Sequence, residues 1–286
     1  MLVNDLVRIY LGHVAQTRKP ATHRQYANRL KPLTAVFGER EFASLSALEL
    51  EDYLAQAGRW PEGHPHAGEQ KAPDTLRANA IALQQLQQFA LDHDEIAEPT
   101  LKKIHKPTGR LRERLPTEEE TQAILSQADP AFVLIYRGLR QCGARPSELC
   151  GATIEEINKG SGCIELKHHK TEGKTGGCRR IAIGKKFGEI IREACGTRET
   201  GPIFLGPRGK PWTAANLSAT YRRLRDRAGL PKDLCLYLAR HEHASLLCSQ
   251  KGINAAAEAL GHRNIATTKR YVKTDPKELR DNQDLV

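Results

Sequence analysis

The sequence lacks the features that would assign it to several large classes of protein. No apolar run approaches the roughly 20 residues that a membrane-spanning helix needs. The seven cysteines form an odd set without a C-x-x-C pair, so neither a zinc ribbon nor a disulfide framework is indicated. Internal repeats and low-complexity segments are also absent. We therefore expect an ordinary globular chain with reduced thiols, and because residues 1–16 show helical periodicity rather than a signal-peptide pattern, we expect it to remain in the cytoplasm.

The charge of the chain is distributed unevenly. The formal net charge is +10 and the isoelectric point is about 9.3. Residues 1–107 contain 13 Lys and Arg against 13 Asp and Glu, whereas residues 108–286 contain 31 against 21. The positive excess therefore belongs to the second part. Such a field favours a polyanionic partner, with nucleic acid first and a membrane surface a weak second.

The first part is predicted to be a small helical bundle. Apolar residues recur there at helical spacing, and Pro and Gly separate the segments. The expected helices span residues 2–16, 22–37, 46–57 and 74–92. His64 and His66 lie in a Pro- and Gly-rich loop, and we interpret them as surface residues rather than metal ligands.

A basic segment separates this bundle from the rest of the chain. It carries six Lys and Arg residues between positions 102 and 114, together with Pro107 and Gly109, and is too polar for a core. We predict an extended linker at 108–115, between a helical domain at 1–107 and a second domain at 116–286 that ends in a polar tail. A linker of this charge can cross a phosphate backbone.

The second part is predicted to be mainly α with a small β-sheet. Residues 162–168 and 178–183 flank a turn rich in Gly and Lys and are typical of a β-hairpin. Thr117 begins a capping-box pattern, and a Pro follows the helix end near Gly143. The expected helices span about 117–128, 131–141, 185–195, 213–228, 240–250, 253–260 and 264–273.

The most informative stretch lies near the C-terminus, where a histidine precedes a tyrosine by nine positions across a helix break. Gly261 suits a helix C-cap and Asn264 an N-cap, so we expect His262 in the turn and Tyr271 about two turns into the next helix. A tyrosine in this place can be aimed while the turn holds a proton donor or acceptor. The alternative is that Tyr271 is an ordinary core or rim residue in a helical stripe. That stripe would contain Ile265, Thr268 and Val272.

Phosphodiester cleavage by a side chain needs an oxygen nucleophile, cations for the charge of the transition state and an acid for the departing alkoxide. Tyr271 can supply the first. Arg145, between a helix end and a Pro-started helix, and Arg240 can hold phosphate oxygens with their guanidinium forks. Considered alone, each is also compatible with a plain surface or helix-stabilising arginine.

Four neighbours of Arg240 bear on its role. Tyr237 precedes it by three residues and can share its face of a helical turn. Glu242 is a candidate to neutralise it. His241 and His243 are interpreted as solvent-facing histidines rather than as a metal pair.

The hairpin turn at 169–177 offers the acid. Lys170 at this tip can protonate a leaving 5′ oxygen if neighbouring arginines lower its pKa. Lys174 is a competing candidate, and both are compatible with solvated turn residues. The turn lacks the G-x-x-x-x-G-K-[ST] order of a nucleotide-binding P-loop.

Taken together, these motifs resemble the tyrosine recombinase family of phage integrases and Xer-type enzymes. The resemblance spans most of residues 115–275 and rests on the Ala-Arg-Pro-Ser-Glu-Leu box at Arg145, Lys-Thr at 170, Arg-His-Glu-His-Ala-Ser at Arg240, and Leu-Gly-His262 with Tyr271 nine residues later. It implies an α+β catalytic domain in the second part. The first part resembles the SAM-like core-binding domain of the family.

The resemblance also implies roles for these residues. Tyr271 would form a 3′-phosphotyrosyl bond, Arg145 and Arg240 would bind the scissile phosphate, Lys170 would be the general acid, and His262 would support proton transfer. The covalent ester conserves bond energy, so neither ATP, a metal nor another cofactor is expected. The implied partner is double-stranded DNA. The implied enzyme is a nucleoid-associated site-specific recombinase, monomeric or weakly oligomeric alone and homotetrameric in the synaptic complex.

One position departs from the family pattern. The family usually has histidine three residues before the second arginine, where this chain has Tyr237. A phenol can donate a hydrogen bond to a phosphate oxygen but does not titrate near pH 7 as imidazole does. A catalytically impaired DNA-binding relative is therefore an alternative, and a type IB topoisomerase-like enzyme is another.

Overall fold

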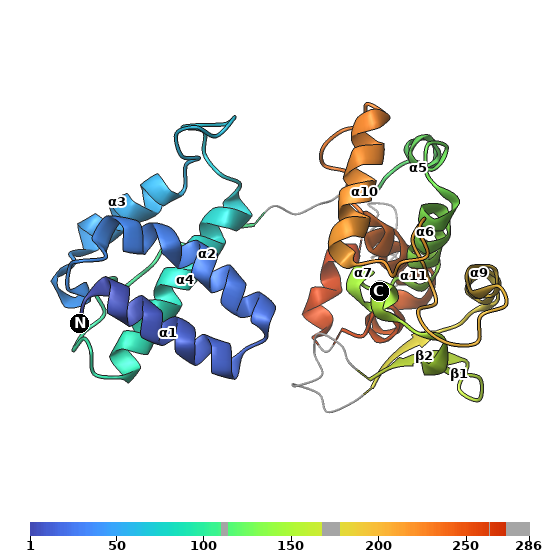
Figure 1. The fold of residues 1–286 in the computed structure, drawn as a ribbon, viewed down its shortest axis with the longest axis horizontal. Coiled ribbons are helices and arrows are strands. Elements are labelled where there is room, and N and C mark those ends of the chain that lie inside the picture. Colours follow the sequence, from blue (N-terminus) through green and yellow to red (C-terminus); the bar gives the residue numbers. More distant parts are fainter. Residues whose placement is uncertain (110–113, 168–177, 263, 273–286) are drawn as a thin grey trace, which may run out of the picture. The chain divides into compact units, whose positions relative to one another are not determined.

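The computed structural model describes residues 1–109, 114–167, 178–262 and 264–272. The chain divides into two compact units, Met1–Arg112 and Glu113–Val286 (Figure 1). Each unit has its own hydrophobic core. The two units meet between residues 112 and 113, within the segment 108–115 that we predict to be a linker.

The first unit is built from helices whose ends follow from local sequence. Proline occupies the first position of α2 and of α4, where its missing N–H leaves no helical bond unmade. Ser46 and Glu49 form a capping box at the start of α3. The helices are α1 (Val3–Thr17), α2 (Pro20–Phe37), α3 (Ala47–Ala57) and α4 (Pro73–Asp92), with a 3₁₀ turn η1 (Phe42–Ser44). Contacts of α4 with α1, α2 and α3 enclose the apolar core of this unit.

The second unit contains most of the helices and the sheet. Its helices are α5 (Glu118–Leu125), α6 (Pro130–Cys142), α7 (Pro146–Gly151), α9 (Lys185–Cys195), α10 (Ala214–Arg227) and α11 (Leu238–Leu260). Its 3₁₀ turns are η2 (Ile154–Glu156), η3 (Ile265–Thr267) and η4 (Lys269–Tyr271). Helix α6 is central, because it packs against α7, α9 and α11 and buries Phe132, Ile135 and Leu139.

The described sheet is antiparallel, in the order β1 (Ile157–Asn158), β2 (Cys163–Leu166) and β3 (Arg179–Ala182). Successive strand residues face opposite sides, so Ile181 and Arg179 share one side of β3. Both are buried, whereas Arg180 and Ala182 are exposed. One arginine of this strand is therefore carried into the protein.

The structure confirms one predicted helix break and corrects one predicted helix. The break expected between 240–250 and 253–260 lies at Gly252, whose φ of 80° and ψ of 170° are not helical, so α11 consists of two helical segments that meet at a kink. The helix expected at 264–273 is instead the pair of short turns η3 and η4. Asn264 does cap η3, since its side chain accepts a hydrogen bond from the Ala266 N–H.

Candidate active site

The site begins where α6 ends. Gly143 adopts a left-handed conformation with φ 59° and ψ 15°, which stops the helix and turns the chain toward Arg145. A side chain could not replace it easily, because a Cβ atom at Gly143 would lie 2.4 Å from the ring of His243. That ring in turn bonds through Nδ1 to the Arg140 carbonyl at 3.1 Å. The turn at Gly143 is therefore held against α11 by the ring of His243.

Arg145 is the N-cap residue of α7 and is paired within its own motif. Its Nη1 lies 2.5 Å from Oε1 of Glu148, and its backbone N–H donates to Oε2 at 2.9 Å. Burial raises the pKa of Glu148, but the hydrogen bonds and charge of Arg145 and the charge of Arg179 outweigh it, so the pKa lies below its usual range. Arg145 is 19% exposed, which leaves part of the guanidinium accessible to an anion.

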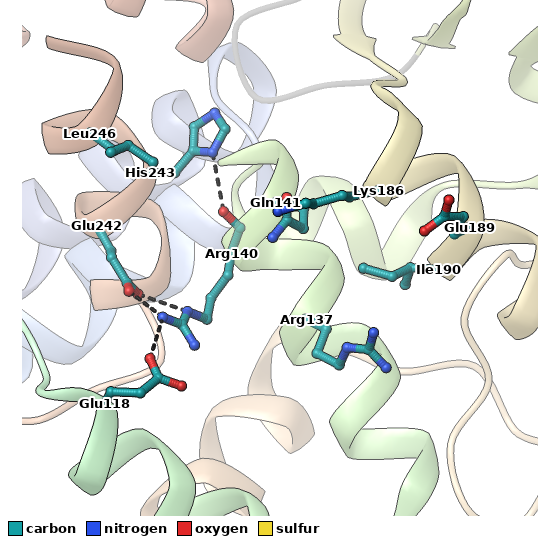
Figure 2. Close-up of a pocket in the computed structure, with 10 residues that line it drawn as sticks. All are labelled: Glu118, Arg137, Arg140, Gln141, Lys186, Glu189, Ile190, Glu242, His243 and Leu246. Atoms are coloured by element: carbon teal, nitrogen blue, oxygen red, sulfur yellow. Dashed lines mark hydrogen bonds and ion pairs between the residues drawn. The ribbon is translucent and has the colours of Figure 1, made fainter. Parts of the chain in front are cut away.

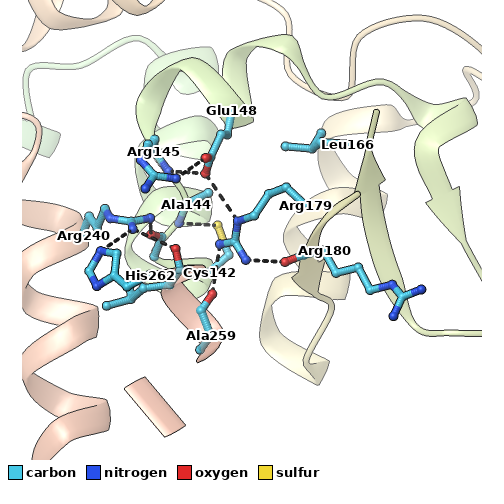
Figure 3. Close-up of polar contacts among 12 residues, drawn as sticks. Cys142, Ala144, Arg145, Glu148, Leu166, Arg179, Arg180, Arg240, Ala259 and His262 are labelled. Carbon is cyan, nitrogen blue, oxygen red and sulfur yellow. Dashed lines mark hydrogen bonds and ion pairs between the residues drawn. The ribbon is translucent and has the colours of Figure 1, made fainter. Parts of the chain in front are cut away.

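Arg240 is fully inside the protein, with 1% of its surface exposed. It donates from Nη1 to the Gly143 carbonyl at 2.6 Å and from Nη2 to the Leu260 carbonyl at 2.9 Å (Figure 3). Its Nε has no hydrogen-bond partner among the described residues. Burial lowers the pKa of this guanidinium, and the nearby charge of Arg145 acts in the same direction.

Arg179, which the sequence analysis did not select, completes the cationic cluster. It is 8% exposed, donates from Nη2 to the Ala259 carbonyl at 2.9 Å, and lies with Nε 3.8 Å from Oε2 of Glu148. Burial lowers its pKa, and the charges of Arg240 and Arg145 contribute to that lowering. Figure 3 shows the guanidinium between the Arg145–Glu148 pair and the end of α11.

The end of α11 explains why these arginines can be buried. A helix leaves its last four carbonyls without helical partners. In α11 the carbonyl of Ala257 accepts a hydrogen bond from the His262 N–H, and the carbonyl of Glu258 accepts one from the Gly261 N–H. The last two, of Ala259 and Leu260, accept the bonds from the buried arginines. Every one of these carbonyls is therefore satisfied.

His262 lies directly beyond this helix end, as expected. Gly261 closes α11 in the left-handed conformation, and the imidazole then points back to Arg240, whose Nη2 is 3.1 Å from Nε2. The other ring nitrogen, Nδ1, is 2.9 Å from Oγ1 of Thr268. Burial and the charges of Arg240, Arg145, Arg270 and Arg179 lower the pKa of His262 to about 4, so the ring is neutral at neutral pH.

Tyr271 lies on η4 and packs against α11 beside Ala244 and Leu260. It is 4% exposed, and burial raises the pKa of its phenol. Its ring stacks on His262 with a centroid distance of 6.1 Å and meets the edge of His241 at 5.0 Å. Tyr271 is thus buried, as in the alternative interpretation of a core residue, but the helical stripe of that alternative does not form, since Ile265 and Val272 are exposed and Thr268 contacts His262.

Tyr237 occupies the N-cap of α11 and does not share the buried face of Arg240. Its side chain is 37% exposed, and its ring meets that of His241 at 5.3 Å. It nevertheless lies close enough that, after burial, the repulsion between the two ionised phenols contributes to the raised pKa of Tyr271. Tyr237 is thus at the edge of the cluster, with a ring of His241 between it and the tyrosine on η4.

The lysine candidates for the general acid are not tested by the structure, because Lys170 and its competitor Lys174 lie outside the described residues.

Glu242 does not neutralise Arg240, because it pairs with Arg140 on α6 (Figure 2). That pair lines a separate hollow of about 560 Å³ between α6, α9 and α11, which contains none of the predicted site residues. In the described ranges no group of His, Cys, Asp and Glu side chains is arranged to hold a metal ion, and no helix is long and apolar enough to span a membrane.

The assembled cluster is positively charged. Three guanidinium groups, of Arg145, Arg179 and Arg240, outnumber the one carboxylate, of Glu148, and the exposed Arg270 adds a further positive charge near the neutral imidazole. Backbone carbonyls, which carry no net charge, hold two of these arginines. The arrangement can therefore bind an anion such as a phosphodiester with a phenol close by.

Comparison with known proteins gives a consistent result. A model of the phage integrase family matches residues 116–278. Tyrosine recombinase XerC of Xylella fastidiosa strain M23 is 30% identical over 178 residues, covering 59% of this chain and 59% of that relative. Tyrosine recombinase XerD of Corynebacterium glutamicum is 24% identical over 307 residues, covering 98% and 97%.

Solved structures share the fold. A lambda integrase (residues 75–356) dimer bound to a COC′ core site has a TM-score of 0.78 at 16% identity, with 96% of this chain and 100% of that chain covered. The Tn1549 transposon integrase in complex with circular intermediate DNA has a TM-score of 0.76 at 18% identity, covering 99% of both chains. The mainly helical fold with a small sheet is therefore confirmed.

Proposed function

Because the chain belongs to the phage integrase family of tyrosine recombinases, we propose that it cuts and rejoins double-stranded DNA at specific sites through a covalent 3′-phosphotyrosyl intermediate. The observation that carries the proposal is that Arg145 lies in one cluster with Arg240, His262 and Tyr271, although it is far from these three in the sequence.

The charge of the cluster favours the transition state of phosphodiester cleavage over the bound diester. A bound phosphodiester carries one negative charge, whereas the five-coordinate transition state of its cleavage carries two. Because the cluster has an excess of positive charge, it attracts the doubly charged transition state more strongly than the singly charged bound diester. Interactions that strengthen between these two states are the ones that accelerate the chemical step.

In the proposed reaction the phenolic oxygen of Tyr271 forms a bond to phosphorus and the bond from phosphorus to the 5′ oxygen breaks. The departing 5′ oxygen takes a proton, which we assign to Lys170 on the strength of the family resemblance. Arg145 and Arg240 hold the non-bridging oxygens. The new ester keeps the energy of the broken bond, so the reverse attack by a 5′ hydroxyl reseals the strand without ATP or a metal.

The proton of Tyr271 needs an acceptor, because burial keeps the phenol neutral. We propose Nε2 of His262, which faces Arg240 and belongs to a ring stacked on the phenol. The surrounding arginines lower its pKa in the free protein. The negative charge of a bound phosphate offsets them and raises the basicity of the imidazole when substrate is present.

DNA is the proposed partner, and a homotetramer on two duplexes is the proposed assembly. The similar structures include lambda integrase as a dimer on a core site and as a tetramer bound to a Holliday junction. The positive excess of residues 108–286 would supply phosphate contacts, so binding should weaken as salt rises. We propose that the helical first unit is the core-binding domain.

Recovery of covalent adducts tests the proposal. Cells expressing the protein are lysed under denaturing conditions, protein-linked DNA is sequenced, and the mapped site is rebuilt as a nicked suicide duplex. Purified wild type should become covalently attached to the strand bearing the 3′ phosphate, and Tyr271→Phe should bind the duplex without an adduct. An adduct that persists in Tyr271→Phe would refute the assignment of the nucleophile.

The same duplex separates two other functions. Tyr237 in place of the usual histidine favours a catalytically impaired DNA-binding relative, which would bind the site and form no adduct. A type IB topoisomerase-like enzyme would form the adduct and relax supercoils as a monomer without exchanging strands between duplexes. Strand exchange between two mapped sites supports the recombinase alone.

A further inference from the structure

Thr268 makes an unusual contact for a residue between two short turns. It follows η3 and precedes η4, its side chain is completely buried, and its hydroxyl lies 2.9 Å from Nδ1 of His262. Thr267, the residue before it, is partly exposed. The chain thus places two adjacent threonines differently, and only the second reaches the imidazole in the described contacts.

The partners of His262 determine which nitrogen carries the proton. An arginine side chain has donors and no acceptor, so the 3.1 Å contact from Nη2 of Arg240 requires a lone pair on Nε2. A neutral imidazole then has its proton on Nδ1. That N–H faces Oγ1 of Thr268, which therefore accepts the bond.

We propose that Thr268 is a positioning residue for the reaction, which fixes His262 in the tautomer protonated at Nδ1 and so leaves a lone pair on Nε2, beside Arg240, to accept a proton. The inference rests on the proposed function and adds a residue to it. Thr268 acts through His262 and does not touch the reacting atoms.

The hydroxyl serves both protonation states of the ring. When Nε2 takes the proton of Tyr271, the imidazole becomes a cation whose Nδ1–H still donates to Thr268. A hydrogen bond to a charged group is stronger than one to a neutral group, so the threonine stabilises the state in which the phenol has lost its proton. Protonation of Nε2 ends its bond from Arg240, whose Nη2 still donates to the Leu260 carbonyl. Without the hydroxyl, the Nδ1–H loses its described acceptor, and the tautomer already protonated at Nε2, which cannot accept the phenol proton, becomes competitive.

The groups around His262 set the pH range in which this matters. Arg240 on α11, Arg145 before α7, Arg179 on β3 and Arg270 on η4 all surround the ring with positive charge, and the Tyr271 ring covers one face. With a pKa of about 4, His262 is neutral across the range in which DNA cleavage is measured. Thr268 therefore determines which ring nitrogen of neutral His262 carries the proton and does not determine the charge of the ring.

Three variants test the role by single-turnover cleavage of the nicked suicide duplex at saturating protein. Thr268→Val keeps the shape and removes the hydroxyl, Thr268→Ser restores a hydroxyl, and Thr267→Val is the matched control. We expect Thr268→Val to slow adduct formation by about 10- to 100-fold without changing DNA affinity, because loss of positioning removes part of the roughly 100- to 10,000-fold that general acid–base catalysis contributes. Thr268→Ser should recover most of the rate and Thr267→Val should retain it. Equal rates for Thr268→Val and wild type overturn the inference.

A second measurement does not depend on activity. In protein labelled with ¹⁵N-histidine, the resonances of His262 are assigned by their loss in His262→Gln. Wild type should show a protonated Nδ1 and an unprotonated Nε2 at pH 7, and Thr268→Val should show a mixture of tautomers. A protonated Nε2 in wild type overturns the inference, even if Thr268→Val fails to fold. Absence of any adduct from wild type, in contrast, refutes the proposed function and leaves the tautomer result standing.

Discussion

Substitution of Gly261 by alanine should disturb the site through one identifiable contact. Gly261 ends α11 with φ 64° and ψ 44°, and a Cβ atom there would lie 3.0 Å from both Nε and Cζ of Arg179. The guanidinium is held by the Ala259 carbonyl and by Glu148, so it cannot swing away as a surface side chain would. Gly261→Ala therefore combines a backbone cost with displacement of a buried arginine.

Substitution of Gly229 by alanine is a control that separates the backbone cost from the displacement of Arg179. It ends α10 with a φ of 66° and the same hydrogen-bond pattern, since Gly229 and Leu230 donate to Asp226 and Arg225 just as Gly261 and His262 donate to Glu258 and Ala257. No described atom lies within 4 Å of a Cβ atom at Gly229. Gly229→Ala thus measures the left-handed backbone cost alone, about 1 to 2 kcal/mol.

The additional loss in Gly261→Ala should come from Arg179. A hydrogen bond to a charged group contributes about 1.5 to 3 kcal/mol, so partial loss of the bond to Ala259 predicts an extra destabilisation of about 1 to 3 kcal/mol. Urea unfolding is followed by the fluorescence of Trp212, in the core of the second unit, in a Trp60→Phe background that removes the other tryptophan. Agreement of the two variants within about 0.5 kcal/mol would refute the reasoning.

Further predictions concern single side chains. Arg179→Gln should slow single-turnover cleavage about 10- to 100-fold, because small displacements of phosphate-binding groups have effects of this size; Arg180→Gln, which removes the exposed neighbour paired with Glu165, should leave the rate unchanged, and equal loss in both would contradict the assignment. The pKa of His262, about 4, lies below the unfolded value near 6.5, so its contribution to stability is present above pH 6.5 and is lost as pH falls toward 4. After allowance for its partial exposure, urea unfolding at pH 7 and 4.5 should show a loss of about 1 to 2 kcal/mol that His262→Gln lacks. Tyr237→Phe should reduce cleavage about three- to tenfold, equivalent to one hydrogen bond, and unchanged cleavage would place its hydroxyl outside the site.

The helices were predictable because each leaves a local signal. Prolines 20, 73, 130 and 146 occupy first positions of helices, and capping boxes start α3 and α5. The C-terminal turns were mispredicted for a physical reason. Residues 264–272 are spaced like a helix, but burial of Tyr271 against α11 and of Thr268 against His262 shapes them into two 3₁₀ turns. Tertiary contacts outweighed the local pattern there.

Three residues of the site were not predicted from the sequence, namely Glu148, Arg179 and Thr268, and each of them contacts and positions another site residue. Glu148 had a signal, because it stands three positions after Arg145 as in a capping box. Arg179 had a weaker one, since alternation along β3 puts it on the same side as buried Ile181. Thr268 had none, because its contact with His262 depends on a turn that spacing alone does not specify.

The way the arginines are held decides what the cluster can bind. If carboxylates accepted the hydrogen bonds of the buried arginines, they would cancel the arginine charge. The carbonyls of Gly143, Ala259 and Leu260 accept these hydrogen bonds and leave the positive charge in place. Those carbonyls are free because α6 and α11 both end nearby at left-handed glycines, and helix C-termini carry partial negative charge that favours cations. Glu148 is the one carboxylate paired with the described arginines of the site. The positive charge that binds a phosphate therefore depends on where α6 and α11 end, so Gly143 and Gly261 support the proposed site by fixing those two helix ends.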